Sequence, residues 1–299
     1  MGFDKGFNDF LGDVSEHVVH RGIVFCVFHP TVRRSERLFV CVFDKPYLVT
    51  EIRAFVIFGR ADLPGEVIDL AANINANGAP KNKNLTVIYG VDPNDLLGEE
   101  IAVGDINGDG RNELALGALV AAGLDNRTPG AGETWLIDTR EPFAGTAIDL
   151  REKNPERAIV IYLDQSHGES GDVIRFADLD RDGFDDLFIG APTYNPMGND
   201  GVTRIDAGML TVIFGSKTGL PNRHGIILLP SGLQAGLQVR YIIGADPFDQ
   251  MSYSLALYDV DGDGYVDIAP NAMLGDGANN TQLNAGEIYV ISGKEFLFP

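Results

Sequence analysis

One acidic motif occurs three times in this chain and constrains its fold more than any other feature. The copies span residues 105–113, 178–186 and 259–267. Each has an oxygen-bearing side chain at positions 1, 3, 5 and 9 and a glycine at position 6. Glycine permits a tight turn, and alternation directs the polar side chains toward one centre. The motif therefore predicts a loop that wraps around a small cation.

The expected ligands suit calcium. Carboxylate, amide and backbone oxygens are the ligands that calcium prefers, and clustered carboxylates repel one another unless a cation lies between them. We predict about three calcium sites, with a backbone carbonyl at position 7 completing each set. The predicted ligands are Asp105, Asn107, Asp109, Arg111 and Glu113 in the first copy, Asp178, Asp180, Asp182, Phe184 and Asp186 in the second, and Asp259, Asp261, Asp263, Tyr265 and Asp267 in the third.

These loops differ from an EF-hand, which begins in the same way but ends with a glutamate at position 12 between two helices. Position 12 here is Leu116, Ile189 or Pro270. Short apolar runs that end at glycine or proline follow each copy, and they predict buried strands. The loops are therefore expected to connect strands. The alternative for any single copy is an acidic hairpin turn without a metal.

Composition narrows the class of protein. The chain has 299 residues, enough for one large domain or two, and its 36 glycines, 15 prolines and 44% apolar residues indicate a turn-rich globular protein. A formal charge of −20 argues against nucleic acid as a partner. The longest apolar run, residues 23–28, is too short for a transmembrane segment, and the first residues lack the features of a secretory signal. The two cysteines, Cys26 and Cys41, do not form a disulfide framework.

Residues 1–53 differ from the rest. Residues 6–12 align with the end of the second acidic loop, with Asp9 at the position of Asp186, so the chain is expected to open inside a truncated fourth loop. Residues 14–53 hold both cysteines, three of the five histidines, and six basic against four acidic residues. Their spacing matches no zinc motif, so we expect core or surface residues. Strands are predicted at 23–28 and 38–43, in a segment that resembles an insertion.

Residues 54–299 are periodic. The first acids of the three loops are 73 and 81 residues apart. An apolar run precedes each loop, and a second apolar run, led by Ala-Gly, follows it. One unit thus holds about four short strands and no clear amphipathic helix. The predicted fold is all-β, with β-propeller blades of about four antiparallel strands and calcium-binding hairpin loops, in a propeller that need not be complete.

The order of these motifs resembles a known family. Tyr/Phe-Gly, acidic loop and Gly-Ala-Pro follow one another as in the FG-GAP repeat of the integrin alpha-chain β-propeller and its bacterial relatives. Parts of this order are found at residues 89–90, 117–118, 190–192, 243–244 and 269–270. Such propellers usually have seven blades, whereas this chain shows three full units and part of a fourth. A fragment, a small propeller and closure by a second chain or by blades from a longer protein all remain open.

The resemblance implies an extracellular or cell-surface recognition or adhesion module in which calcium is structural. A protein or glycan ligand is expected to bind through loops on one propeller face, here 121–130, 194–205 and 274–284. The sequons at Asn84, Asn126 and Asn279 are compatible with secretion.

The alternatives are the non-catalytic propeller portion of a secreted hydrolase, of the phospholipase or polysaccharide-degrading type, and a structural spacer. Residues 168–172 faintly resemble a serine-nucleophile loop, with His167 beside them. The corresponding stretches 95–100 and 249–254 contain no histidine, and no base and orienting acid are implied. We predict that His167 is a surface residue, that Ser170 belongs to a turn, and that the chain is not an enzyme.

Overall fold

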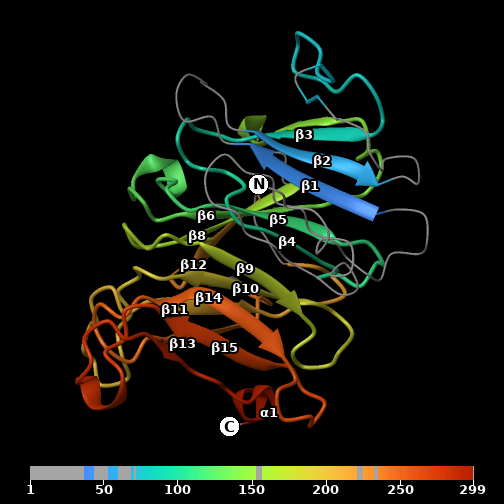
Figure 1. The fold of residues 1–299 in the computed structure, drawn as a ribbon. Coiled ribbons are helices and arrows are strands. Elements are labelled where there is room, and N and C mark those ends of the chain that lie inside the picture. Colours follow the sequence, from blue (N-terminus) through green and yellow to red (C-terminus); the bar gives the residue numbers. More distant parts are fainter. Residues whose placement is uncertain are drawn as a thin grey trace, which may run out of the picture. The chain divides into compact units, whose positions relative to one another are not determined.

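The computed structural model describes residues 37–43, 53–59, 69–70, 72–152, 157–220, 225–231 and 235–298. These residues form strands joined by turns, which confirms the predicted all-β class (Figure 1). Helix in the described ranges is limited to three short 3₁₀ segments, η1 (Leu124–Asn126), η2 (Leu150–Glu152) and η3 (Ala278–Asn280), and to α1 (Gly293–Leu297). Within this part of the chain, no helix has the length and hydropathy that a membrane span requires.

The chain divides into two compact units. The first comprises residues 1–90 and 141–149, and the second comprises 91–140 and 150–299. The first unit holds a sheet in the order β1-β2-β3-β7, made of β1 (Arg37–Phe43), β2 (Arg53–Gly59), β3 (Leu85–Tyr89) and β7 (Ala147–Asp149). Phe55, Ile57 and Val87 belong to its core.

The strand predicted at 38–43 is confirmed, because β1 pairs antiparallel with β2 from Arg37 opposite Gly59 to Phe43 opposite Arg53. The predicted strand at 23–28 and the truncated loop at 1–13 lie outside the described residues. The division of the chain at residue 54 stays a prediction, although the pairing of β1 with β2 continues the sheet across that point.

The second unit contains three sheets. The first has the order β4-β5-β6-β8-β12, with β4 (Ile101–Gly104), β5 (Glu113–Ala118), β6 (Glu133–Ile137), β8 (Ala158–Leu163) and β12 (Ile226–Leu229). The second has the order β9-β10-β11-β13, with β9 (Val173–Ala177), β10 (Asp186–Ala191), β11 (Met209–Ile213) and β13 (Val239–Ile243). The third is β14-β15-β16, with β14 (Met251–Tyr258), β15 (Asp267–Ala272) and β16 (Glu287–Ile288).

The first two of these sheets each contain four antiparallel strands, as predicted, and a fifth strand links them. β12 follows β11 of the second sheet in the chain but pairs parallel with β8 at the edge of the first. A parallel pair of this kind joins residues far apart in sequence, here Ile226 with Val160. β12 therefore connects these two neighbouring sheets.

The three sheets of the second unit stack in chain order (Figure 1). Side chains alternate between two cores, as expected for a strand buried on both faces. In β10, Leu187 and Ile189 belong to one core, which includes residues of the first sheet, whereas Phe188 belongs to the other, which includes residues of the third. All three side chains are buried, and each contributes about 1.5–3 kcal/mol of burial free energy. Stacking therefore stabilises this unit.

A repeated loop geometry joins one sheet to the next. His167 and Glu169 have positive φ before β9. Phe248 and Gln250 have positive φ before β14. In each loop, three backbone N–H groups donate to carbonyls in the connection between the second and third strands of the preceding sheet. Both junctions between sheets are therefore built in the same way. The pairs are His167 to Pro129, Glu169 to Gly130 and Ser170 to Ala131 at one junction, and Phe248 to Ile205, Gln250 to Asp206 and Met251 to Ala207 at the next, with distances of 2.8–3.1 Å.

Candidate metal centres

The three acidic loops occupy equivalent places in the three sheets of the second unit. Loop 1 (105–113) connects β4 to β5, loop 2 (178–186) connects β9 to β10, and loop 3 (259–267) connects β14 to β15. Each loop joins two adjacent antiparallel strands where an EF-hand would have two helices. The prediction of strand connections is therefore confirmed.

Backbone hydrogen bonds give the three loops the same shape. The position 1 carboxylate accepts from the backbone N–H of position 6, with donor–acceptor distances of 2.8, 3.0 and 2.9 Å in loops 1, 2 and 3. The glycines at position 6, Gly110, Gly183 and Gly264, have φ of 86°, 90° and 90°. Other residue types rarely adopt this conformation, so the turn requires glycine.

The side chains at positions 3 and 5 also turn back onto their own loop. The position 3 oxygen accepts from the N–H of position 5, and the position 5 carboxylate accepts from the N–H of position 7. This places Arg111, Phe184 and Tyr265 on the same turn as the acids. The ligand role of their carbonyls stays a prediction.

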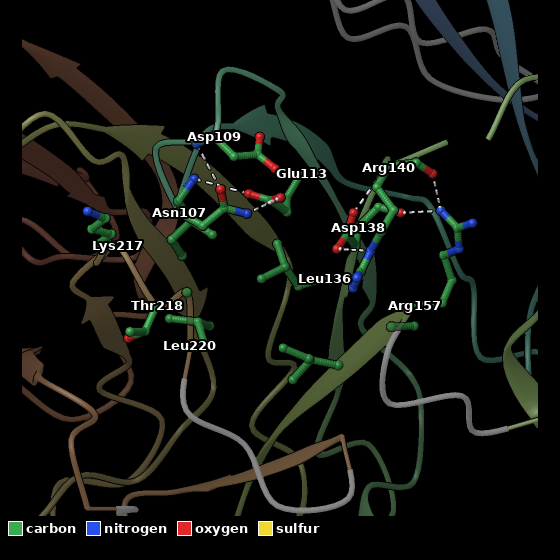
Figure 2. A pocket seen from close by; sticks show the side chains of 14 residues that line it. Asn107, Asp109, Glu113, Leu136, Asp138, Arg140, Arg157, Lys217, Thr218 and Leu220 are labelled. Atoms are coloured by element: carbon green, nitrogen blue, oxygen red, sulfur yellow. Dashed lines mark hydrogen bonds and ion pairs between the residues drawn. The ribbon is translucent and has the colours of Figure 1, made fainter. Parts of the chain in front are cut away.

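Carboxylate oxygens come together in two of the loops. One oxygen each from Asp178, Asp180 and Asp182 lies within 4.8 Å of the others, and the same holds for Asp259, Asp261 and Asp267. Loop 1 has an amide at position 3, and Asn107 donates from Nδ2 to Oε1 of Glu113 at 2.7 Å (Figure 2). The candidate ligand atoms are hard oxygens in all three loops, which fits calcium.

The position 9 acids anchor the loops to the sheets. Glu113, Asp186 and Asp267 are 4%, 1% and 3% exposed. Each accepts from the N–H of position 2, at 3.2, 2.9 and 2.8 Å. Each position 9 carboxylate is thus held at the base of its loop.

Two glycines that sequence analysis did not assign complete this arrangement. Gly215 and Gly293 donate to the second oxygen of Asp186 and Asp267, at 2.9 and 3.1 Å. A Cβ on Gly215 would lie 2.5 Å from the Asp185 carbonyl oxygen. A Cβ on Gly293 would lie 2.9 Å from the Val266 carbonyl carbon and closer still to its oxygen. A side chain at either position would therefore collide with backbone, and the signal in the sequence is a glycine shortly after the second apolar run of these units.

Burial and mutual repulsion perturb the carboxyl groups. Burial raises the pKa of Glu113 to about 8, the hydrogen bond from Ile106 opposes this, and Asp109 and Asp138 raise it further. Burial likewise raises the pKa of Asp186 to about 7 despite its hydrogen bonds. A nearby cation favours the ionised form of such groups. The loops therefore have the electrostatic character of cation sites.

Neighbouring loops contact one another. The Phe184 ring of loop 2 lies where a side chain on Gly108 of loop 1 would be, since a Cβ placed there would be 2.7 Å from Cδ1 of the ring and closer to Cε1. Asp105 and Asp185 also exchange two hydrogen bonds, at 2.8 and 3.0 Å.

Loops 2 and 3 also contact one another. The guanidinium of Arg181 in loop 2 lies 5.0 Å from the centroid of the Tyr265 ring in loop 3. The loops form a continuous row, which the sequence did not reveal.

The stretch that resembled a serine-nucleophile loop lies at a junction between sheets. Ser170 is fully buried, and its Oγ has no hydrogen-bond partner among the described residues. His167 is exposed, as predicted. In the described part of the chain no base is hydrogen-bonded to Ser170, so this geometry offers no activated nucleophile.

Comparison with known proteins agrees with this architecture. The FG-GAP repeat family matches residues 97–137 and 170–206, which contain loops 1 and 2. The chain contains FG-GAP repeats. The sheets of the second unit are accordingly blades of the β-propeller type, and the resemblance stated from the sequence is confirmed.

The relatives include integrin alpha chains. Integrin alpha-IIb of Homo sapiens is 28% identical over 211 residues, covering 67% of this chain and 17% of that protein. Integrin alpha-V of Gallus gallus is 26% identical over 199 residues, covering 66% and 15%. Phosphatidylinositol-glycan-specific phospholipase D of Rattus norvegicus is 30% identical over 134 residues, covering 44% and 14%. The matched region thus spans 14% to 17% of the length of these relatives.

Proposed function

We propose that the chain is a calcium-stabilised FG-GAP propeller module that serves extracellular recognition or adhesion. The observation that carries the proposal is the row of three loops with the same internal hydrogen bonds and buried acids at position 9. About three calcium ions would be held by the predicted ligands. The ion supplies positive charge, and the chain supplies oxygens that the backbone has already oriented.

The calcium part of the proposal is tested by thermal unfolding in excess calcium and in excess chelator. A ligand that binds only the folded state stabilises it by about 2.7 kcal/mol per site at a hundredfold excess over Kd. We expect a rise in Tm with calcium, and a smaller rise for Asp182→Ala. Glu152→Ala removes the same charge from an exposed position outside the loops and serves as the control. Equal Tm in calcium and chelator would refute the proposal.

Recognition is proposed to use the connections at the other end of the blades. In antiparallel hairpins, successive turns lie at opposite ends of the strands. The segments 121–130, 194–205 and 274–284 follow the second strand of each blade, whereas the acidic loops follow the first. Exposed apolar side chains in and beside these segments support a protein or glycan partner. They are Val120 beside the first segment, Met197, Val202 and Ile205 in the second, Met273 beside the third, and Leu283 within it.

The recognition part is tested by replacing Met197, Val202 and Ile205 together with serine. We expect the variant to keep the calcium-dependent Tm and to lose binding to an extracellular-matrix preparation coated on a plate. Val290→Ser changes an exposed apolar residue outside the three segments and should bind as the parent does. If binding survives both the triple change and matching changes in the other two segments, these connections are not the ligand surface.

The similarity to the rat phospholipase D favours a second candidate, in which the chain is the non-catalytic propeller portion of a secreted hydrolase. Both candidates hold that this chain has no catalytic residues of its own. Incubation with a fluorogenic phospholipid tests this, because the chain should release no product above background. Turnover that disappears in Ser170→Ala would identify an enzyme and overturn both candidates.

A further inference from the structure

A pocket of about 430 Å³ lies beside loop 1, within the range of small-molecule sites (Figure 2). Four segments of the second unit form its walls. They are loop 1, the end of β6 with the residues after it, the start of β8, and the connection 217–220 that follows β11. The pocket thus joins parts of the first and second sheets.

Three basic side chains line this pocket although the chain is strongly acidic. Lys217 lies on one side, and Arg140 and Arg157 lie on the other (Figure 2). Arg157 donates to the backbone carbonyls of Asp138 and Arg140, at 2.9 and 2.6 Å, and Arg140 Nε pairs with the Asp138 carboxylate at 2.7 Å. These contacts hold both guanidinium groups at the wall. Guanidinium and ammonium groups are the usual partners of carboxylates.

Three acids also line the pocket; one of them pairs with an arginine, and a calcium ion is proposed beside the other two. Asp138 pairs with Arg140. Asp109 and Glu113 belong to loop 1, where the proposed calcium ion would balance them. A pocket without the ion therefore repels an anion more strongly than a pocket with it.

The rest of the lining is mixed in character. Leu136 and Leu220 are buried and give the pocket an apolar surface, while Thr218 offers a hydroxyl group. A ligand that has a flat apolar face, hydroxyl groups around it and one acidic group would match this lining. A sugar ring that carries a carboxylate has these properties. The volume also exceeds what a single aspartate or glutamate side chain would fill.

Loop 1 and the Lys217 segment are connected. The N–H of Ser216 donates to the carbonyl of Ile106 in loop 1 at 3.0 Å. A Cβ on Gly219 would lie 3.7 Å from the Asn107 side chain, which is ordinary contact. A cation that orders loop 1 therefore also orders the wall that carries Lys217.

We propose that this pocket binds an acidic sugar, with Lys217 meeting its carboxylate. Binding is strengthened by calcium, because loop 1 forms one wall. The calcium dependence rests on the proposed function, whereas recognition of the acid rests on the pocket itself.

The test is isothermal titration of the full chain with D-glucuronate, once in excess calcium and once with chelator. D-glucose is the neutral matched probe, and an N-acetylated aspartate amide represents an acidic peptide. We expect D-glucuronate to bind and D-glucose not to bind. Lys217→Ala should weaken glucuronate binding by about tenfold, the effect of losing one charged hydrogen bond. Lys83→Ala removes an exposed lysine in the other unit and should change nothing.

The outcomes separate the two proposals. Equal binding of glucose and glucuronate, or unchanged affinity in Lys217→Ala with an unchanged Tm, overturns the pocket proposal whatever calcium does to stability. Tighter binding of the aspartate probe than of glucuronate overturns the sugar and indicates an acidic peptide. If calcium raises Tm but leaves glucuronate affinity unchanged, the coupling through loop 1 is wrong and the calcium sites stand.

Discussion

The packing of neighbouring blades predicts a large difference between two glycine substitutions at equivalent places. Gly208 follows Ala207 and leads into β11, and Gly286 follows Ala285 and leads into β16. Both have positive φ, 87° and 78°. A Cβ on Gly208 would lie 2.6 Å from the backbone nitrogen of Met251 in the next blade, and closer still to its carbonyl oxygen. A Cβ on Gly286 would meet nothing closer than 3.6 Å.

The expected losses follow from these distances. Alanine at positive φ costs about 1–2 kcal/mol at either position. At Gly208 the blades must also separate, which costs about 1–3 kcal/mol for overpacking and about 1 kcal/mol for the strained hydrogen bond from Met251 to Ala207. We therefore expect Gly208→Ala to lose about 3–6 kcal/mol and Gly286→Ala about 1–2 kcal/mol, from the same principles.

The assay is urea unfolding at 25 °C in excess calcium, with the midpoint and the slope m both fitted. A lower midpoint at unchanged m reports a change in stability of the folded state. Equal losses for the two variants would refute the packing of the β14 segment on Gly208. A third variant, Gly132→Ala, repeats the test at the preceding junction, where the Cβ would lie 2.8 Å from the Ser170 carbonyl carbon.

Four further predictions concern the loops and the core. Calcium affinity should rise from pH 6 to pH 8, because the pKa of Glu113 is raised to about 8 and protons compete with the ion; affinity that is flat in titrations at pH 6, 7 and 8 would contradict this. Without calcium the sign is reversed, since the folded state holds more protons than the unfolded one and Tm should fall as pH rises toward 8. Phe184→Ala should lower the Hill coefficient of calcium binding, whereas Phe248→Ala, at an exposed ring, should not; equal coefficients would show that loops 1 and 2 bind independently. Leu187→Ala should cost about 2–5 kcal/mol, against less than about 0.5 kcal/mol for Leu283→Ala at the surface, and urea midpoints that do not differ would show that the Leu187 face of β10 is not buried.

Local structure follows from the amino-acid sequence alone. The acidic loops could be predicted because each is closed by contacts within nine residues, between position 1 and position 6 and between neighbouring polar positions. Gly110, Gly183 and Gly264 mark the turn since few other residues adopt their φ. The strands after the loops could be predicted for the same reason, because their apolar runs are local patterns. Resemblance to FG-GAP repeats added how such units assemble.

Contacts between distant elements emerge in the folded chain. Nothing near Gly215 in the sequence shows that its N–H binds the Asp186 carboxylate, and nothing near Ile226 shows that β12 pairs with β8. The pocket brings Lys217 to the side opposite Arg157, which lies far earlier in the chain. A continuous apolar run indicates that both faces of a strand are buried but not which blade covers each face. That choice depends on the stacking of whole sheets, whose free energy is spread over many residues, so only the folded structure reveals it.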